Sequence, residues 1–209
     1  MIAIVDYEAG NLTSVARALS KIGYKHQITG DPAVIAHAER VIFPGVGAAG
    51  AAMESLKRRG LDMALKDVME SGRPLLGICL GTQVILERSL ENSADCLGLI
   101  KGEVSLFTTD MKAADGSRLK IPHMGWNTIA LQCEHPVFAG CPENAEFYFV
   151  HSYYPDPGDT ESVIATTDYG ISFASVIGFE NLVACQFHPE KSGRPGLRIL
   201  ENFCRWQPC

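Results

Sequence analysis

Several features that would assign this chain to common classes of protein are missing from its sequence. No apolar run approaches the length of about 18 residues that a membrane-spanning helix needs. The 18 Lys and Arg against 24 Asp and Glu give a formal net charge of −6, and the basic residues form no cluster or stripe. These absences disfavour a nucleic-acid-binding or membrane-surface role. We expect the partner to be a protein or a small polar molecule, with no nucleic acid and no membrane.

Paired cysteines and a targeting segment are also missing. The seven cysteines include no C-x-x-C pair and have no zinc spacing with the histidines. The N-terminal stretch 1–6 has no basic region before its short apolar run, which predicts a first strand rather than a signal peptide. Reduced thiols in a cytoplasmic enzyme are the simplest account. We expect no metal and no cofactor.

The chain alternates strand and helix patterns over its first 76 residues, as α/β proteins do. The apolar periodicity predicts strands over 2–7, 24–29, 40–43 and 74–76, with helices over 11–22, from 31, 49–59 and 61–70. Asn11 is a candidate N-cap for the first helix. This order indicates parallel strands with right-handed crossovers and helices on both faces of a sheet.

The second half of the chain is richer in short strands. Strands are predicted over 97–107, 119–131, 146–154, 162–169, 171–179 and 181–187, and a last helix over about 196–205. No linker rich in Pro, Gly or Ser divides the halves. We therefore expect one domain over residues 1–209, an open, mostly parallel mixed sheet extended by β-hairpins in the C-terminal half.

The stretch Gly77-Ile78-Cys79-Leu80-Gly81-Thr82-Gln83 has the pattern of a nucleophile elbow written with cysteine. It follows the apolar residues 74–76 and precedes residues 84–88, which predict a helix. The two glycines remove Cβ atoms that would clash in the strained turn. A thiol at a helix N-terminus faces the positive end of the helix dipole, which favours the thiolate. A buried, inert cysteine is the alternative unless a base lies nearby.

That base is predicted at the end of a late strand. The β-rich run 181–187 leads into His188-Pro189-Glu190. His188 could take the thiol proton and later protonate a leaving amine, and Glu190 could orient the imidazole. The sequence alone thus predicts a Cys79, His188 and Glu190 triad.

A second glycine-rich turn, Pro44-Gly45-Val46-Gly47, ends the third predicted strand, where open α/β sheets place their ligand sites. An ordinary turn is the alternative. With Cys79 at the end of a later strand, an oxyanion site is favoured, and we assign its donors as the backbone N–H groups of Val46 and Leu80.

The elbow together with Gln186-Phe187-His188-Pro189-Glu190 resembles the triad-type (class I) glutamine amidotransferase family, which releases ammonia from L-glutamine. Further stretches resemble the glutaminase subunits of imidazole glycerol phosphate synthases. They are Asp6-Tyr7 with Gly10-Asn11-Leu12, Pro44 to Gly47, Pro122-His123-Met124-Gly125-Trp126-Asn127, and Tyr148-Phe149-Val150-His151-Ser152-Tyr153. Glu8-Ala9 and Thr82 depart from the pattern of those subunits, which affects only loops beside the site.

The resemblance implies roles for residues that carry no signal by themselves. Glu91 would bind the ammonium group of the substrate, although most glutamates just past a helix are solvated surface charges. Gln83 would contact the amino-acid end or the amide of glutamine, and the backbone of Gly47 would pass close to it. Backbone groups of Ser152 and Tyr153 would hold the α-carboxylate.

The same resemblance implies a protein partner, a cyclase subunit of the (β/α)₈ barrel type. Ammonia would pass to it, giving imidazole glycerol phosphate and aminoimidazole carboxamide ribonucleotide in histidine biosynthesis. Asn11, Trp126 and Lys191 would lie at the interface, although Trp126 could equally be a core residue. Two rival hypotheses stay open: a glutaminase subunit serving anthranilate or vitamin B6 synthesis, and a catalytically silent scaffold.

Overall fold

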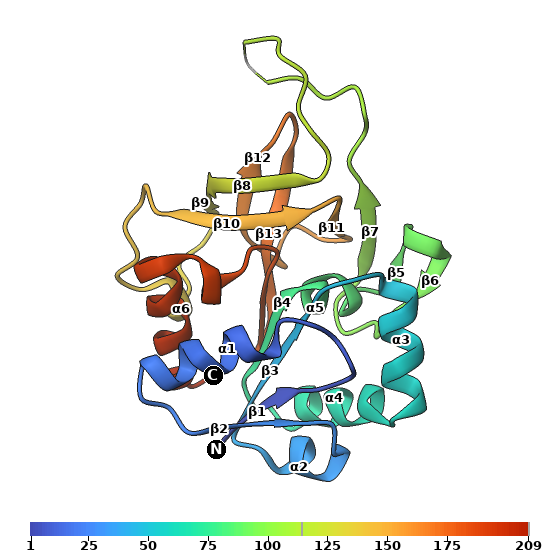
Figure 1. Ribbon diagram of the computed structural model, residues 1–209, viewed down its shortest axis with the longest axis vertical. Coiled ribbons are helices and arrows are strands. Elements are labelled where there is room, and N and C mark those ends of the chain that lie inside the picture. The colour runs from blue at the N-terminus through green and yellow to red at the C-terminus, as the bar shows by residue number, and fades with distance from the viewer. Residues whose placement is uncertain (114, 209) are drawn as a thin grey trace.

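The alternating first half of the chain contributes four strands to the large central sheet (Figure 1). The computed structural model describes residues 1–113 and 115–208. The strands of this half are β1 (Ile2–Val5), β2 (His26–Thr29), β3 (Arg40–Gly45) and β4 (Leu75–Cys79). The helices are α1 (Leu12–Lys21), α2 (Pro32–His37), α3 (Ala49–Arg58), α4 (Leu61–Glu70) and α5 (Leu80–Val84). Within the described ranges, no helix has both the length and the apolar character needed to cross a membrane.

The large sheet has eight strands in the order β2-β1-β3-β4-β14-β13-β12-β9. It is completed by β9 (Ala130–Leu131), β12 (Val163–Asp168), β13 (Ser172–Phe179) and β14 (Leu182–Cys185). The neighbours from β2 to β14 are parallel, and β13, β12 and β9 continue the sheet in antiparallel pairs. The predicted mostly parallel mixed sheet is confirmed. The late strand β14 lies directly beside β4, with Cys185 opposite Ile78.

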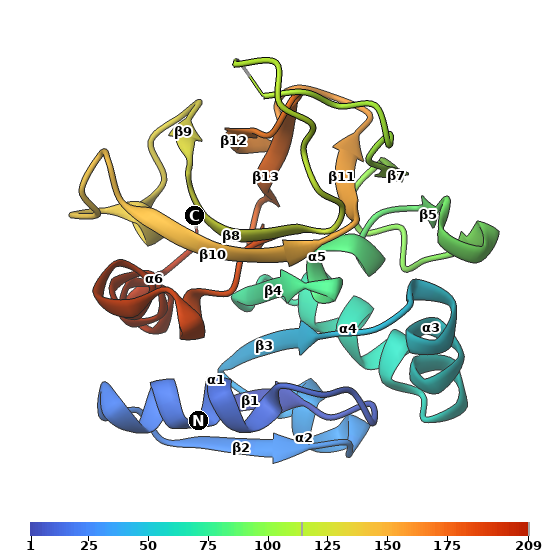
Figure 2. The same cartoon turned by 45° about the horizontal axis from the view of Figure 1, so that its top comes forward.

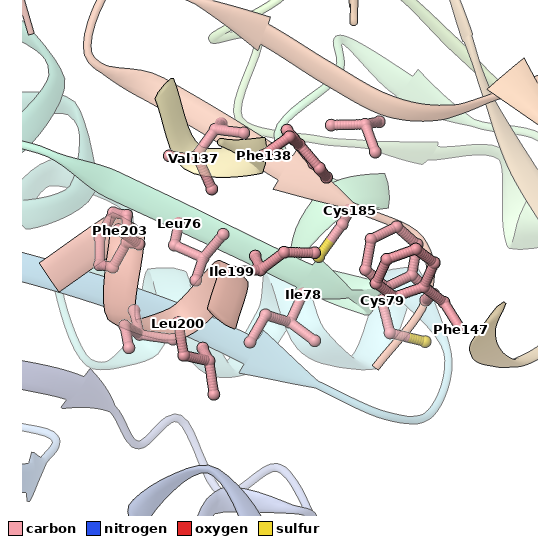
Figure 3. Packing of buried hydrophobic residues seen from close by; sticks show 14 of the residues in the cluster. Leu76, Ile78, Cys79, Val137, Phe138, Phe147, Cys185, Ile199, Leu200 and Phe203 are labelled. Atoms are coloured by element: carbon pink, nitrogen blue, oxygen red, sulfur yellow. The ribbon is translucent and has the colours of Figure 1, made fainter. Parts of the chain in front are cut away.

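Helices cover both faces of the sheet, as predicted (Figure 2). Successive residues of a strand point to opposite faces. Ile2 and Ile4 of β1 therefore join one core with α1 and α6 (Gly193–Arg205), whereas Ala3 and Val5 join another with α2, α3 and α4. In the first core, Leu76 and Ile78 of β4 lie beside Ile199, Leu200 and Phe203 of α6, and Cys79 lies near Phe147 (Figure 3).

The C-terminal half differs from the expected extension of a single sheet, because several of its strands form two smaller sheets. β8 (His123–Thr128) pairs with β10 (Glu146–His151). The other small sheet has the order β11-β7-β5-β6. Its strands are β5 (Arg88–Ser89), β6 (Ala94–Asp95), β7 (Gly102–Leu106) and β11 (Tyr153–Pro157). The predicted strand over 146–154 is broken at Ser152, since apolar alternation marks a strand without specifying its partner.

The helix predicted over 84–88 is wrong. Helix α5 starts directly after Cys79 and ends at Val84, and Arg88 belongs to β5. The backbone carbonyls of Val84, Ile85 and Leu86 accept hydrogen bonds from the N–H groups of residues 97, 99 and 98. These long-range bonds replace the helical ones, and they also explain why β7 starts at Gly102 rather than near 97. The described ranges also contain three 3₁₀ turns: η1 (Glu91–Ser93), η2 (Pro136–Phe138) and η3 (Pro189–Lys191).

Candidate active site

The elbow around Cys79 forms at the predicted strand-to-helix turn. Cys79 ends β4 and precedes α5 with φ 54° and ψ −105°, a strained conformation for a residue with a side chain. A Cβ atom on Gly77 would lie 2.8 Å from Cβ of Ala184, and one on Gly81 would lie 1.9 Å from the carbonyl oxygen of Phe43. Both positions therefore require glycine, although the nearest atoms belong to the neighbouring strands β14 and β3 rather than to the turn itself.

His188 and Glu190 reach the elbow because β14 lies beside β4. Nδ1 of His188 is 2.8 Å from Oε1 of Glu190, and both side chains are fully buried. Within the described part of the chain, Nε2 of His188 and Oε2 of Glu190 have no hydrogen-bond partner. The contact between His188 and Glu190 is thus formed, whereas Nε2 of His188 makes no hydrogen bond of ordinary geometry to Sγ of Cys79.

The surroundings of His188 favour its protonated form. Burial opposes protonation, but the nearby sulfur of Cys79 and the carboxylate of Glu190 outweigh it and raise the pKa of His188 to about 9. A carboxylate in contact with a buried imidazolium stabilises it, because charges are poorly screened in the interior. At neutral pH His188 therefore holds a proton that it can donate.

Asn11 contacts the same carboxylate, which its sequence pattern does not reveal. Its Nδ2 lies 2.6 Å from Oε1 of Glu190 and 3.3 Å from Nδ1 of His188. Asn11 occupies the N-cap position of α1 as predicted, but in the left-handed region with φ 76° and without a side-chain capping bond. Its amide is directed to Glu190 instead of capping the helix.

A pair of buried glutamines connects the sulfur of Cys79 with the backbone of Tyr153. Nε2 of Gln186 lies 3.6 Å from Sγ of Cys79, and its Oε1 accepts a hydrogen bond of 3.0 Å from Nε2 of Gln83. The Gln83 amide also donates to the carbonyl oxygen of Tyr153 at 2.9 Å. Both N–H groups of Gln83 are thus engaged by the protein.

One cavity of about 320 Å³ opens onto Cys79. Its lining contains eight residues predicted from the sequence: Val46, Gly47, Cys79, Leu80, Gln83, Glu91, Ser152 and Tyr153. The other lining residues are Pro122, Val150 and His151. Oε2 of Glu91 accepts a hydrogen bond of 2.8 Å from the N–H of Ala49, which fixes this carboxylate at the cavity wall.

The two glycines of the turn beside the cavity are required for different reasons. A Cβ atom on Gly45 would lie 1.7 Å from Oη of Tyr7, so the tyrosine ring takes the place of a side chain. Gly47 has φ 114° and open space around the position of a Cβ atom, so its need for glycine is conformational. Val46 between them is 40% exposed.

The three predicted interface residues lie outside the cavity lining. Trp126 is 53% exposed on β8 and packs its edge against Tyr148, with 5.9 Å between ring centroids, so it is not a core residue. Met124, two residues away on the same strand, is 61% exposed. Lys191 is exposed at the end of η3. Asn11 is half-buried against the triad.

Sequence reasoning gave no role to three buried residues that surround the site, although each lies within a quoted motif: Gln186, His123 and His151. Nδ1 of His123 lies 2.9 Å from Nε2 of His151, whose Nδ1 lies 2.9 Å from the carbonyl oxygen of Tyr153. Burial lowers the pKa of His123 to about 4 and that of His151 to about 3. The signal in the sequence was the presence of these polar residues within the quoted motifs. Their hydrogen-bond partners come from distant strands and could not be predicted.

Comparison with known proteins places this geometry in a family. Residues 3–206 match the family described as glutamine amidotransferase class-I. The chain is 54% identical over 203 residues to imidazole glycerol phosphate synthase subunit HisH of Nitratidesulfovibrio vulgaris strain DSM 19637 / Miyazaki F, covering 97% of this chain and 95% of that protein. It is 48% identical over 210 residues to the protein of the same name from Aromatoleum aromaticum, covering 99% of both.

Solved structures with low sequence identity share the fold. PurLQS from Thermotoga maritima superposes with a TM-score of 0.75 at 16% identity, covering 98% of this chain and 97% of that one. The glutaminase domain of Trypanosoma brucei CTPS with bound acivicin gives 0.67 at 16% identity, covering 100% and 97%.

Proposed function

The chain belongs to the class I glutamine amidotransferase family, among relatives named HisH, and we propose that Cys79, His188 and Glu190 perform its glutaminase reaction. The enzyme serves as the glutaminase subunit of imidazole glycerol phosphate synthase in histidine biosynthesis. A single glutamine amidotransferase domain spanning residues 1–209 is part of the proposal.

In the first half-reaction, the sulfur of Cys79, whose proton is held by His188, attacks the carbonyl carbon of the L-glutamine side-chain amide. The backbone N–H groups of Val46 and Leu80 stabilise the oxyanion, and the proton on His188 passes to the nitrogen, which leaves as ammonia. Leu80 is the first residue of α5, so its N–H has no partner within the helix.

In the second half-reaction, water attacks the glutamyl thioester. His188 takes a proton from the water, the carbon–sulfur bond breaks, and the sulfur recovers its electron pair as glutamate leaves. Glu190 holds the imidazole through the 2.8 Å contact with Nδ1 and stabilises its positive charge.

The glutamine backbone would bind at the far wall of the cavity. Glu91 accepts the α-ammonium, and backbone groups of Ser152 and Tyr153 hold the α-carboxylate. Gly47 passes its backbone beside the substrate. Gln83 presents its carbonyl oxygen to the substrate, because both of its N–H groups are used by the protein.

The ammonia acceptor would lie on a cyclase subunit of the (β/α)₈ barrel type, with which the chain forms a heterodimer. We assign Asn11, Trp126 and Lys191 to the interface, because Trp126 and Met124 expose apolar surface and Lys191 supplies a charge. The acceptor reaction gives imidazole glycerol phosphate and aminoimidazole carboxamide ribonucleotide. A cytoplasmic location is supported by the six cysteines of the described ranges, all of which are free.

The observation that carries this proposal is the cavity that joins Cys79 to a fixed carboxylate and to the 152–153 backbone. This arrangement matches a substrate with an amide at one end and an α-amino acid at the other. The test measures glutamate release from L-glutamine by the chain alone and with the cyclase subunit and its ligand. Release that is absent in both would favour a silent scaffold, and release that is unchanged in Cys79→Ala would reject the triad.

A further inference from the structure

A hydrogen-bonded path, buried except at Asn127 and Tyr153, leads from strand β8 to Cys79. It starts at Asn127, whose Nδ2 lies 3.3 Å from Nε2 of His123, and continues through the 2.9 Å contact between His123 and His151. His151 contacts the Tyr153 carbonyl oxygen at 2.9 Å, which also accepts from Gln83 at 2.9 Å. Gln83 donates to Gln186, whose amide reaches Sγ of Cys79.

The partners fix the direction of every bond along the path. The Tyr153 carbonyl can only accept, so Nδ1 of His151 carries a hydrogen and the Nε2 of its neutral ring is an acceptor. His123 must then donate from Nδ1 and accept at Nε2, where the Asn127 amide donates. The low pKa values of both histidines agree with neutral rings. The tautomers of both histidines are thereby assigned, and each donor along the path meets an acceptor.

Aromatic packing holds the remote part of the path rigid. The His123 ring is stacked between Tyr169, at a centroid distance of 3.9 Å, and Phe149, at 4.8 Å. It is 3% exposed and does not line the cavity. A nitrogen left unpaired in such apolar surroundings is costly, so the imidazole keeps its partners and the path has little freedom to rearrange.

We propose that Gln186 and the His123–His151 pair are positioning residues for the nucleophile and for the glutamine-binding wall. Gln186 donates to the sulfur of Cys79 and stabilises its negative form. The histidine pair holds the Tyr153 carbonyl, which fixes Gln83 and, through it, the Gln186 amide. This inference rests on the proposed function for its meaning, because Cys79 is taken as the nucleophile and the 152–153 backbone as substrate-binding.

The alternative is that the two histidines have only a structural role, in which each ring provides a hydrogen-bond partner for the other in the core. The positions of the residues distinguish the two readings. His123 and Cys79 share no direct contact, and unconnected substitutions have multiplicative effects on a rate. If the path is connected, substitution of Gln186 already removes its effect on Cys79. An additional substitution of His123 should then have no further effect on the rate.

The test follows alkylation of the full chain by iodoacetamide, with modification at Cys79 quantified by mass spectrometry so that the other thiols do not interfere. Loss of the Gln186 donor in Gln186→Leu should slow alkylation of Cys79 about tenfold at neutral pH and move the midpoint of its pH profile upward. His123→Phe, which keeps an aromatic ring but removes both nitrogens, should slow it about threefold. The double variant should react at the rate of Gln186→Leu alone.

His135→Phe is the matched control. His135 is a partly buried histidine packed against Trp206 and Phe138, and its Nδ1 also accepts one hydrogen bond, from the N–H of Val137. It has no connection to the path. The control should leave Cys79 alkylation unchanged, and the proposal is overturned if His123→Phe slows alkylation no more than the control does, or if the double variant shows the product of the two single effects.

Two conservative variants keep the proposal testable if the first pair folds poorly. His123→Asn can place an amide donor near the position of Nδ1, so it should restore most of the alkylation rate lost in His123→Phe. Gln186→Glu keeps an acceptor for Gln83 but puts an oxygen beside the sulfur, and it should slow alkylation at least as much as Gln186→Leu. Fast alkylation in Gln186→Glu would contradict the proposal. Because glutamine is absent from this assay, failure of the proposed glutaminase function would appear separately, as wild-type chain that reacts at Cys79 but releases no glutamate with its partner.

Discussion

The Nδ2 atom of Asn11 donates a hydrogen bond of 2.6 Å to Oε1 of Glu190, across 179 positions of sequence. The same oxygen faces Nδ1 of His188 at 2.8 Å. A single carboxylate oxygen thus holds both the start of α1 and the imidazole of the triad. Because Asn11 makes no capping bond with its side chain, its amide can be removed without uncapping the helix.

Replacing Asn11 by glycine therefore tests this contact cleanly. Glycine accepts the left-handed conformation at φ 76° but cannot reach Glu190. We expect kcat for glutamine hydrolysis to fall about tenfold, the typical effect of one charge-assisted hydrogen bond, with the melting temperature nearly unchanged. Asn11→Ala should add a conformational cost that lowers the melting temperature. Unchanged kcat in Asn11→Gly would show that Glu190 orients His188 without this support.

Substitution of the nucleophile separates the two half-reactions. Cys79→Ala should abolish glutamine hydrolysis and leave partner binding intact, because the sulfur takes part only in release of ammonia. The complex carrying this variant should still form the cyclase products when an ammonium salt is added. Loss of that ammonia-dependent activity would contradict the proposed division of labour.

Glu190→Gln should weaken catalysis less than loss of Cys79 or His188, since Glu190 moves no proton to or from substrate. The carboxylate helps to raise the pKa of His188 to about 9. Activity that needs protonated His188 is lost as pH rises through this pKa, so the variant should move the basic limb of the kcat profile to lower pH. Equal damage from all three substitutions, together with a lower melting temperature, would indicate that Glu190 mainly holds the fold.

Local patterns made the turn at Cys79 and the contact between His188 and Glu190 predictable from the sequence. The spacing of Gly77, Cys79 and Gly81 is a pattern within a single turn, although the atoms that a Cβ at either glycine would meet first belong to neighbouring strands. The contacts of Asn11 and Gln186 were not predictable in this way. The Gln186 contact depends on β14 lying beside β4, and a strand pattern specifies neither its neighbour nor its register. The Asn11 contact depends on the packing of α1 against η3.

The same limit explains the errors in the fold. Residues 84–88 have an apolar pattern that suits a helix, but residues 97–99 occupy their carbonyls. Strand patterns in the C-terminal half are real, yet β8 and β10 pair with each other instead of joining the large sheet. Long-range hydrogen bonds decided both cases.

The buried histidine pair should make the protein sensitive to acid. Both histidines titrate near pH 6.5 when unfolded, whereas burial lowers the pKa of His123 to about 4 and that of His151 to about 3 in the folded chain. Between pH 6.5 and 4 the unfolded state binds more protons, so the free energy of unfolding falls as pH decreases. At pH 5 each histidine should account for about 2 kcal/mol of this loss.

Urea unfolding at pH 7 and pH 5 measures this effect. His123→Asn removes one titrating group, so the stability lost between the two pH values should be smaller than in the wild type by about 2 kcal/mol. His37→Asn, at an exposed position on α2, provides a control with a similar loss of one imidazole. Parallel pH dependence in His123→Asn and the wild type would show that His123 is not kept neutral by the fold.

The last prediction concerns control of the oxyanion turn by the partner. We expect the isolated chain to hydrolyse glutamine slowly, because loss of one oxyanion donor costs about 10²–10³ in rate, a difference that contacts with a partner could supply. Rotation of the 45–46 peptide unit would turn the Val46 N–H toward or away from the oxyanion. Gly45 is a poor place to test this, since any Cβ atom would meet Tyr7.

Gly47 is the better position, because its φ of 114° disfavours other residues while the space around it is open. Gly47→Ala should destabilise the resting turn by about 1–3 kcal/mol and so shift the turn away from it. The activity without partner should rise, and the stimulation by the liganded cyclase subunit should shrink about tenfold or more. Gly140→Ala carries a similar positive-φ penalty at a turn remote from the cavity, with φ 71° and open space, and should leave the stimulation unchanged. The measurement is kcat at saturating glutamine, with and without the partner. Equal stimulation in wild type and Gly47→Ala would place the switch elsewhere. A wild-type chain that is as fast alone as in the complex would leave no inactive state for the turn to explain.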